Sequence, residues 1–303
     1  MHISVLLEES IKYLNLKKNS IIVDATLGYG GHSQRILEKI PEGFLYAFDQ
    51  DKEAIKEANK KLEKTGSNYE IIYSNFKNLK EELGKRNVLV DGFLFDLGVS
   101  SPQLDNAERG FSFHKDANLD MRMDRNNPLT AYEVVNNYSL EELTNIFYKY
   151  GEEKYAKSIA KGIVLERANK KIETTLELAE IIKNNVPEKY RKKGHPARKV
   201  FQAIRIEVND ELNVLEIALK DALKLLKPGG RICVITFHSL EDKICKRIFR
   251  EVSEIPKELE KLPVIPDALK PKFKVITNVK PSDDEIENNI RARSSRLRVI
   301  ERV

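Results

Sequence analysis

The sequence Asp-Ala-Thr-Leu-Gly-Tyr-Gly-Gly-His-Ser, residues 24–33, is a glycine-rich turn between a predicted strand and a predicted helix. Residues 21–23 before it are apolar, as in a buried strand, and residues 34–40 after it carry apolar side chains at helical spacing. Glycine lets the backbone turn sharply and approach a ligand, and the N-terminus of the next helix offers free N–H groups. This order indicates a nucleotide-type cofactor site.

Asp49 ends the next predicted strand, 21 residues after Gly28. An acidic residue at about this distance hydrogen-bonds ribose hydroxyls, both in NAD enzymes and in S-adenosylmethionine enzymes. A dinucleotide fingerprint has Gly or Ala at its sixth position, where this chain has Ser33. The turn therefore disfavours NAD, and Asp49 disfavours a plain tight turn without a ligand.

Strand and helix signals alternate through the first hundred residues. Strands are predicted at 21–24, 44–49, 69–73 and 90–96, and a helix at 52–64, which indicates an α/β protein with a parallel sheet. Residues 109–199 carry no strong strand signal, but capping boxes begin at Ser139 and Thr174. We therefore predict an α/β domain from residues 1–108 and 200–303, interrupted by an all-helical insertion at 109–199.

The α/β pattern resumes after the insertion. One long helix is predicted over 201–226, a turn at 227–230, and strands at 231–237, 274–277 and 296–300, with a surface loop over 254–275. Ser239 and Asp242 form a candidate N-cap pair. The segment from His238 to Asp242 lacks the spacing of a helical metal site, so no metal is predicted and His238 is a candidate substrate contact.

Composition restricts the class of protein. The chain has 303 residues, 41% hydrophobic, with a net charge of +5. It has no apolar run of about 18 residues and no signal-peptide pattern, which predicts no membrane span. Its two cysteines, Cys233 and Cys245, lie outside any CxxC pair, as expected in the reducing cytoplasm. Basic residues cluster over 183–205 and 291–302; this suits a polyanion or a solvated basic face, and Arg198, Arg205 and Arg293 are candidate phosphate contacts.

Seven motifs of the chain closely resemble the RsmH (MraW) family, the bacterial methyltransferases that act on a cytosine N4 amine of 16S rRNA. The resemblance runs in order from His2 to the C-terminus. The motifs lie at residues 24–33, 96–105, 109–113, 119–124, 201–212, 237–242 and 291–298. The resemblance implies a class I, Rossmann-like S-adenosylmethionine-dependent methyltransferase fold with a helical insertion that recognises the substrate.

The resemblance also implies roles for individual residues. Gly30, Gly31 and His32 would line the methionine end of S-adenosylmethionine, and Asp49 would hold its ribose. Phe76 would lie near the adenine, although a phenylalanine there taken alone is more often a core residue. Asp96 and Gln103 would complete the pocket.

The implied reaction moves a methyl group from a sulfonium to a cytosine N4 near the decoding site of 16S rRNA, either naked or in the small ribosomal subunit. The amine is a poor nucleophile, so the enzyme must align the reactants and accept hydrogen bonds from the amine. Asp96, a candidate catalytic residue, or a carbonyl of the following loop would accept them. Phe111 or Phe113 would stack on the base, or would anchor the loop to the core. The sequence leaves monomer and homodimer open.

Two other classes of function fit parts of the chain. A methyltransferase acting on small molecules would share Gly30, Gly31 and Asp49 but would not need the arginine clusters. A non-enzymatic RNA-binding module would need no cofactor pocket, so binding of S-adenosylmethionine separates it from either enzyme.

Overall fold

The computed structural model describes residues 4–192, 194–255, 266 and 269–303. Two compact units make up the chain: Met1–Gly98 with Leu212–Val303, and Val99–Glu211. The predicted insertion at 109–199 lies within the second unit, whose bounds are wider at both ends. Residues 200–208 belong to it because their apolar side chains pack into the helical core. None of the described helices is long and apolar enough to cross a membrane.

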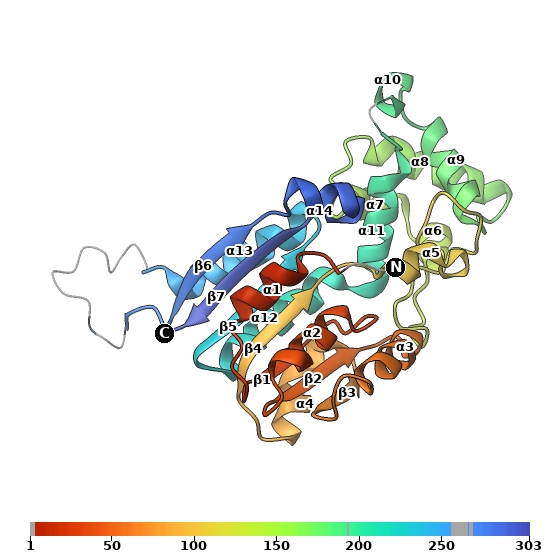
Figure 1. The fold of residues 1–303 in the computed structure, drawn as a ribbon. Coiled ribbons are helices and arrows are strands. Elements are labelled where there is room, and N and C mark those ends of the chain that lie inside the picture. The colour runs from red at the N-terminus through yellow and green to blue at the C-terminus, as the bar shows by residue number, and fades with distance from the viewer. Residues whose placement is uncertain (1–3, 193, 256–265, 267–268) are drawn as a thin grey trace. The chain divides into compact units, whose positions relative to one another are not determined.

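The first unit is built on a seven-stranded sheet in the order β3-β2-β1-β4-β5-β7-β6 (Figure 1). Strands β1 to β5 run parallel, and β7 runs antiparallel to both of its neighbours. The strands are β1 (Ile21–Asp24), β2 (Phe44–Asp49), β3 (Tyr69–Tyr73), β4 (Val90–Asp96), β5 (Leu226–Thr236), β6 (Phe273–Val279) and β7 (Arg296–Arg302). The four N-terminal strands have the predicted bounds, which confirms the Rossmann-like fold class.

Helices cover both faces of this sheet (Figure 1). The helical segments of the first unit are α1 (Leu7–Leu14), α2 (Gly31–Lys39), α3 (Lys52–Leu62), η1 (Phe76–Asn78), α4 (Leu79–Lys85), α12 (Glu211–Leu225), α13 (Ser239–Ser253), α14 (Asp283–Asn288) and η4 (Ile290–Ser294). Val23 and Phe93 pack with α4, α12 and α13, whereas the adjacent Ile22 and Leu94 pack with α1, α2 and α3. Burial on both faces explains why these strands are apolar runs without alternation.

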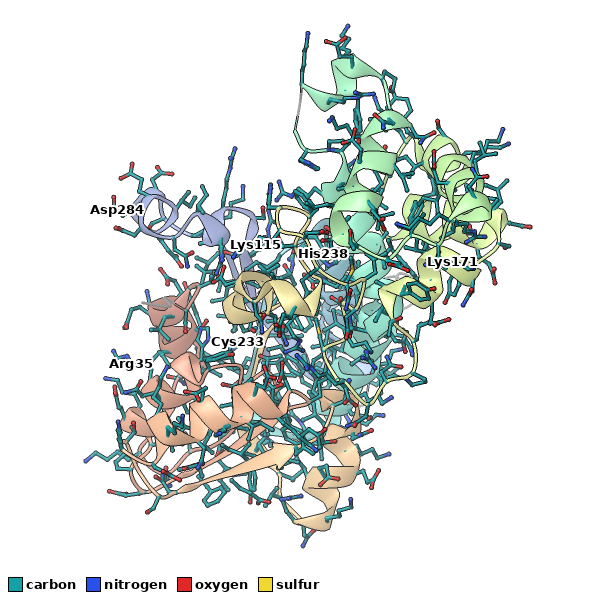
Figure 2. All side chains as sticks on the ribbon, turned by 90° about the vertical axis from the view of Figure 1, so that its right-hand side faces the viewer. Arg35, Lys115, Lys171, Cys233, His238 and Asp284 are labelled. Atoms are coloured by element: carbon teal, nitrogen blue, oxygen red, sulfur yellow. The ribbon has the colours of Figure 1, made fainter. Side chains whose placement is uncertain are left out.

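The two cysteines are buried on opposite faces of the sheet. Cys233 lies in β5 with the α1–α3 core, and Cys245 lies in α13 with the other core. Both thiols are free, and burial raises the pKa of each well above its usual value. Figure 2 shows Cys233 inside the first unit, whereas Asp284 points away from it. Neither thiol has the lowered pKa of a reactive cysteine.

The second unit is helical. Its segments are α5 (Ser101–Asp105), η2 (Ala107–Arg109), α6 (Ala131–Asn137), α7 (Leu140–Lys149), α8 (Ala156–Asn169), α9 (Thr175–Asn184), α10 (Glu188–Arg191) and α11 (Ala197–Asn209). Capping boxes begin α7 at Ser139 and α9 at Thr174, as the sequence predicts. The core includes Phe147, Ile163 and Ile204. An isolated bridge between Asn118 and Thr174 is the one β pairing outside the named strands in the described part of this unit.

The predicted single helix over 201–226 is wrong. Asp210 adopts a left-handed backbone, with φ of 50°, between α11 and α12. Aspartate tolerates this conformation better than most residues. The Asn209 side chain leaves the helix to bond the loop before α6, donating to Met121 O and accepting from Met123 N, both at 2.8 Å. The apolar pattern continues across the break, so periodicity alone could not reveal it.

Two further local predictions need correction. Residues 227–230 belong to β5, and a register shift opposite Val90 and Gly92 replaces the predicted turn. Helix α13 is capped one residue earlier than predicted, by His238 with Glu241. Asp242, the predicted capping partner, instead accepts two hydrogen bonds from Arg298, at 2.7 and 3.0 Å.

Candidate cofactor site

Three aspartates end three neighbouring strands of the first unit. Asp24 ends β1, Asp49 ends β2 and Asp96 ends β4. Because β1 lies between β2 and β4 and all three are parallel, the carboxyl groups lie at the same edge of the sheet. The strand order reverses between β1 and β4, and open α/β sheets bind ligands beyond such a point.

Asp24 braces the glycine turn from inside. Its carboxylate accepts a hydrogen bond from Ser33 Oγ at 2.7 Å and one from Thr26 N at 3.1 Å. Burial raises the pKa of Asp24 to about 6, although these hydrogen bonds oppose the rise. In the sequence analysis, Ser33 was noted only because it occupies the sixth position of the dinucleotide fingerprint, where Gly or Ala is expected. In the structure its hydroxyl ties the start of α2 to the end of β1.

Asp49 holds the other side of the turn. Its Oδ2 accepts from Gly28 N and its Oδ1 from Asp51 N, both at 2.8 Å. Burial raises the pKa of Asp49 to about 7 against these hydrogen bonds. Each carboxylate oxygen has a second lone pair. The group can therefore accept from two vicinal hydroxyls, as the predicted ribose role requires.

Asp96 carries a buried oxygen without a hydrogen-bond donor. Its backbone N donates to Thr26 Oγ1 at 2.6 Å, and its Oδ2 lies 3.5 Å from His32 Nδ1. Its Oδ1 has no partner among the described residues. Burial, with the charges of Asp24 and Glu241, raises the pKa of Asp96 well above its usual value. A buried acceptor left unpaired is costly, so this oxygen suits an N–H or O–H donor on a bound ligand.

His32 connects the N-terminal segment to Asp96. The ring is buried near the start of α2, and its Nε2 lies 3.2 Å from Val5 O. A carbonyl oxygen only accepts, so Nε2 is assigned the hydrogen and Nδ1 faces the carboxyl group of Asp96. The approach of Nδ1 to Oδ2 is favourable when a proton lies between them. His32 thereby orients the Asp96 carboxyl group.

The glycines of the turn are needed for different reasons. Gly30 has φ of +73°, and a Cβ there would lie 3.2 Å from the Ala58 Cβ. A Cβ at Gly31 would lie 2.0 Å from Ser4 Oγ. Both positions therefore bring the start of α2 close to neighbouring elements without a side chain between them.

Replacing Gly30 with alanine should lower the free energy of unfolding by about 1–2 kcal/mol, because left-handed backbone is costly for a residue with a Cβ. Gly84→Ala is the matched control, since a Cβ at Gly84 in α4 meets no atom within 4 Å. That change should be neutral or stabilising by up to about 1 kcal/mol. Urea unfolding of both variants measures the difference; equal stabilities would contradict the role given to Gly30.

Phe76 begins the short helix η1 after β3 and is half-buried. Its ring meets Phe95 edge-on, with centroids 5.9 Å apart. The contact explains both sequence readings, because one part of the ring packs on the core while another stays accessible at the carboxyl edge of the sheet. Its role beside an adenine stays a prediction.

Three of the five predicted site residues of the second unit lie before helix α6. Gln103 lies in α5, is buried, and accepts from Ser100 N through Oε1 at 3.1 Å. Phe111 is buried in the helical core, so this ring anchors its loop. Phe113 is only partly buried. Of the two phenylalanines, Phe113 is the one with ring surface available for a base.

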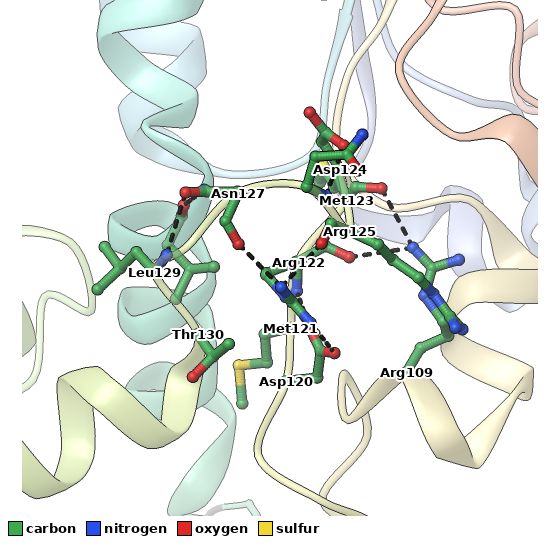
Figure 3. A network of polar contacts seen from close by, with 12 residues as sticks. Arg109, Asp120, Met121, Arg122, Met123, Asp124, Arg125, Asn127, Leu129 and Thr130 are labelled. Atoms are coloured by element: carbon green, nitrogen blue, oxygen red, sulfur yellow. Dashed lines mark hydrogen bonds and ion pairs between the residues drawn. The ribbon is translucent and has the colours of Figure 1, made fainter.

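Arginines hold together the loop between η2 and α6 (Figure 3). Arg109 donates to the carbonyls of Arg122 and Met123, at 3.0 and 3.2 Å. Arg122 bonds both carboxylate oxygens of Asp120, at 2.8 and 3.0 Å. Burial alone would raise the pKa of Asp120, but its bonds with Arg122 lower it below the usual value. The charged side chains of these two motifs therefore stabilise the conformation of the loop.

The predicted phosphate contacts differ in availability. Arg205 is largely buried and holds Glu211 through two 2.8 Å hydrogen bonds, so its charge serves an internal ion pair. Arg198 and Arg293 are exposed.

His238, the other predicted substrate contact, lies 3.1 Å from Glu241 through Nε2, and Glu241 also accepts from Phe237 N at 2.7 Å. The structure thus gives Arg205 and His238 local structural partners that the sequence did not suggest.

Comparison with known proteins gives a match over the whole chain. Residues 1–303 match the MraW methylase family. The chain belongs to this family. This membership confirms the resemblance found in the motifs. The cofactor is therefore S-adenosylmethionine, and the protein is an S-adenosylmethionine-dependent methyltransferase.

Solved structures with similar folds include three bacterial proteins. One, assigned as an rRNA methylase of Clostridium thermocellum, has 14% identity and a TM-score of 0.48, with all of both chains covered. An rRNA methylase of Streptococcus thermophilus has 13% identity and a TM-score of 0.46, covering 100% of this chain and 99% of that one. A Streptococcus mutans protein assigned as a methyltransferase, solved with SAH, has 15% identity and a TM-score of 0.47, with both chains fully covered.

The carboxyl edge of the first unit fits this cofactor. Asp49 offers two acceptors for ribose hydroxyls. The roles of Asp24, Thr26 and Ser33 in building this edge were missed from the sequence. Their signal was present, because Asp24 and Thr26 stand two residues apart before the glycines, a spacing that lets an aspartate accept from a backbone N–H.

Proposed function

We propose that this methylase transfers a methyl group to the N4 amine of a cytosine in 16S rRNA, near the decoding site. Membership of the MraW methylase family supports the reaction class. The observation that carries the chemistry is Asp96, whose buried Oδ1 lacks a donor at the carboxyl edge of the sheet. An exocyclic amine has N–H groups to supply that bond.

When bound, S-adenosylmethionine would supply an electrophilic methyl group, and its S–C bond would break to leave S-adenosylhomocysteine. The N4 lone pair is delocalised into the cytosine ring, so the amine needs orientation and an acceptor for its hydrogens. Asp96 Oδ1 accepts an N–H and directs the lone pair away from that bond. As the new N–C bond forms, the amine nitrogen becomes cationic and must lose one proton. The Asp96 carboxylate takes it.

The environment of Asp96 suits this step. Its raised pKa makes the ionised carboxylate a stronger base than an exposed aspartate. His32, whose Nε2 lies 3.2 Å from Val5 O, approaches Oδ2 through Nδ1 at 3.5 Å and leaves Oδ1 for the amine. No covalent enzyme intermediate is needed, which agrees with two buried cysteines of raised pKa.

The substrate class is tested by transfer of a labelled methyl group. Purified enzyme and labelled S-adenosylmethionine are incubated with unmodified small ribosomal subunits, with naked 16S rRNA, and with a pool of free nucleosides and metabolites. We expect label in the rRNA of one of the first two samples. Label only in free small molecules would favour a small-molecule methyltransferase, and cofactor binding without transfer would favour a non-enzymatic role.

The helical unit is proposed to recognise the RNA, with Phe113 and Arg198 as candidate contacts, and Arg293 of the first unit is a third candidate. Arg198 and Arg293 would touch phosphates and so position the RNA without reading its sequence. Such contacts make affinity fall steeply as salt rises.

A further inference from the structure

The helical unit contains an open pocket of about 710 Å³ that takes no part in the methyl transfer proposed at Asp96. Helix α9 forms one wall through Leu176 and Lys183. The segment between α10 and α11 forms another through Lys192 and His195, and Phe113 lines the pocket between them. All these residues belong to the second unit, so the pocket is a feature of that unit alone.

Aromatic rings form one side of the pocket. His195 stacks on Phe113, with ring centroids 4.5 Å apart and planes inclined by 23°. Phe113 in turn meets the buried Phe201 edge-on, at 5.4 Å. The rings of Phe113 and His195, here called the ring platform, are therefore fixed to the core from one side. Leu176, with 43% of its surface exposed, adds an apolar neighbour.

Hydrogen bonds fix the loop that carries Phe113 to the helix opposite. The buried Thr175, at the start of α9, donates through Oγ1 to Lys115 O at 2.7 Å and accepts from Ala117 N at 3.1 Å. Its own N–H donates to Ala117 O at 2.9 Å. These bonds fix the Phe113 loop to α9, so this part of the pocket needs little ordering on binding.

The rim of the pocket is basic. Lys183, Arg191 and Lys192 face one acidic residue, Glu180. Lys183 lies 3.1 Å from Glu180, and Lys192 lies 3.2 Å from Glu188, but these pairs are exposed. Exposed ion pairs contribute little, so the lysines can exchange them for a stronger anion. Burial, with the charges of His114 and Lys183, lowers the pKa of His195, which favours a neutral ring at physiological pH.

We propose that this pocket binds an unpaired nucleotide of single-stranded RNA. The base stacks on the ring platform, and Lys183 and Lys192 hold its phosphate. Flat rings beside cations are the combination by which proteins bind single strands. An acidic peptide would use the lysines but gain nothing from the ring platform. The inference rests on the proposed RNA substrate and adds a specific nucleotide subsite to it.

Fluorescence anisotropy with a labelled, unstructured RNA of about ten nucleotides tests the subsite. His195→Ala in the full chain should weaken binding about 5- to 100-fold through lost stacking, with an unchanged salt slope. His195→Tyr keeps a ring and should bind within twofold of wild type. The double variant Lys183→Ala with Lys192→Ala should lower the slope of log K against log salt by about 0.7, because the two lysines neutralise one phosphate of a single strand.

Matched controls come from the same unit. Tyr148→Ala removes a ring that is 70% exposed on α7, and Lys161→Ala removes an exposed cation on α8; neither residue lines the pocket. Both should bind RNA as wild type does. Phe113→Ala is a second ring variant, accepted only where its thermal unfolding stays cooperative.

Three results would overturn the subsite. The first is that His195→Ala binds RNA as its controls do, and the second is that wild type binds no single-stranded RNA. The third is that a polyglutamate peptide displaces RNA, and that its affinity falls in the lysine variant as much as the RNA affinity does but does not fall in the ring variants. Failure of the proposed function looks different. In that case rRNA receives no methyl label, yet RNA affinity still depends on His195, Lys183 and Lys192.

Discussion

Replacing Asp96 with asparagine should lower kcat for methyl transfer by about 10²- to 10⁴-fold, the usual contribution of a positioned proton acceptor. Asparagine has nearly the same shape and keeps an acceptor oxygen, but it cannot take the amine proton. The backbone N–H of residue 96 would still donate to Thr26 Oγ1. The loss should therefore appear mainly in kcat, with a smaller change in the Kd for S-adenosylmethionine.

The pH profile separates a lost base from a distorted site. Burial raises the pKa of Asp96 well above its usual value. The carboxylate that accepts the proton is therefore scarce at low pH, and kcat of wild type should rise as pH rises through that pKa. Asp96→Asn should lose this rising limb.

Asp91→Asn is the matched control for this experiment. Asp91 lies near the opposite end of β4, where it accepts from Ile21 N at 2.7 Å and from Lys227 at 3.0 Å. Its replacement should leave kcat and the pH profile unchanged. Turnover of Asp96→Asn within about threefold of wild type, at normal cofactor affinity, would contradict the catalytic role.

Asp49→Asn should weaken S-adenosylmethionine binding by about 10- to 100-fold, because hydrogen bonds to a charged acceptor contribute about 1.5–3 kcal/mol. Asn keeps one acceptor oxygen and loses the second acceptor for the ribose hydroxyls. Isothermal titration calorimetry measures the change. S-adenosylhomocysteine has the same ribose, so its affinity should fall by a similar factor.

Ionisation of the Asp49 carboxyl group should make the affinity for S-adenosylmethionine depend on pH. Burial raises the pKa of Asp49 to about 7, and the ionised form accepts from ribose hydroxyls. Cofactor affinity should therefore increase about tenfold between pH 6 and pH 8, with proton release on binding below pH 7. Asp49→Asn should show a much flatter profile. An unchanged slope in that variant would remove Asp49 from the ribose site.

The strands were predictable because each is an apolar run ended by a polar residue. Asp24, Asp49 and Asp96 mark the ends of β1, β2 and β4 at the predicted positions. Parallel strands buried on both faces give this signal strongly. The break between α11 and α12 at Asp210 gave no such signal in the sequence, because the apolar spacing continues through it and only the backbone conformation changes.

The site was predictable as residue types and not as contacts. The spacing of Gly28 and Asp49 predicted a ribose role for Asp49, but it did not predict the hydrogen bond that Gly28 N donates to Asp49 Oδ2. The pairing of His32 with Asp96 joins residues 64 positions apart and depends on the sheet order. Burial distinguishes Phe111 from Phe113, which the sequence could not do. Phe111 is buried in the helical core, whereas Phe113 is only partly buried and has accessible surface.

Mapping the methylated atom decides whether this enzyme methylates the N4 amine of a cytosine in 16S rRNA. Unmodified 16S rRNA, naked and in small subunits, is treated with enzyme and deuterated S-adenosylmethionine, then digested to nucleosides and analysed by mass spectrometry. We expect one new labelled nucleoside, N4-methylcytidine, from a single position near the decoding site, and none with Asp96→Asn in the same time. Label on a ring carbon, on a ribose hydroxyl or on another base would contradict it.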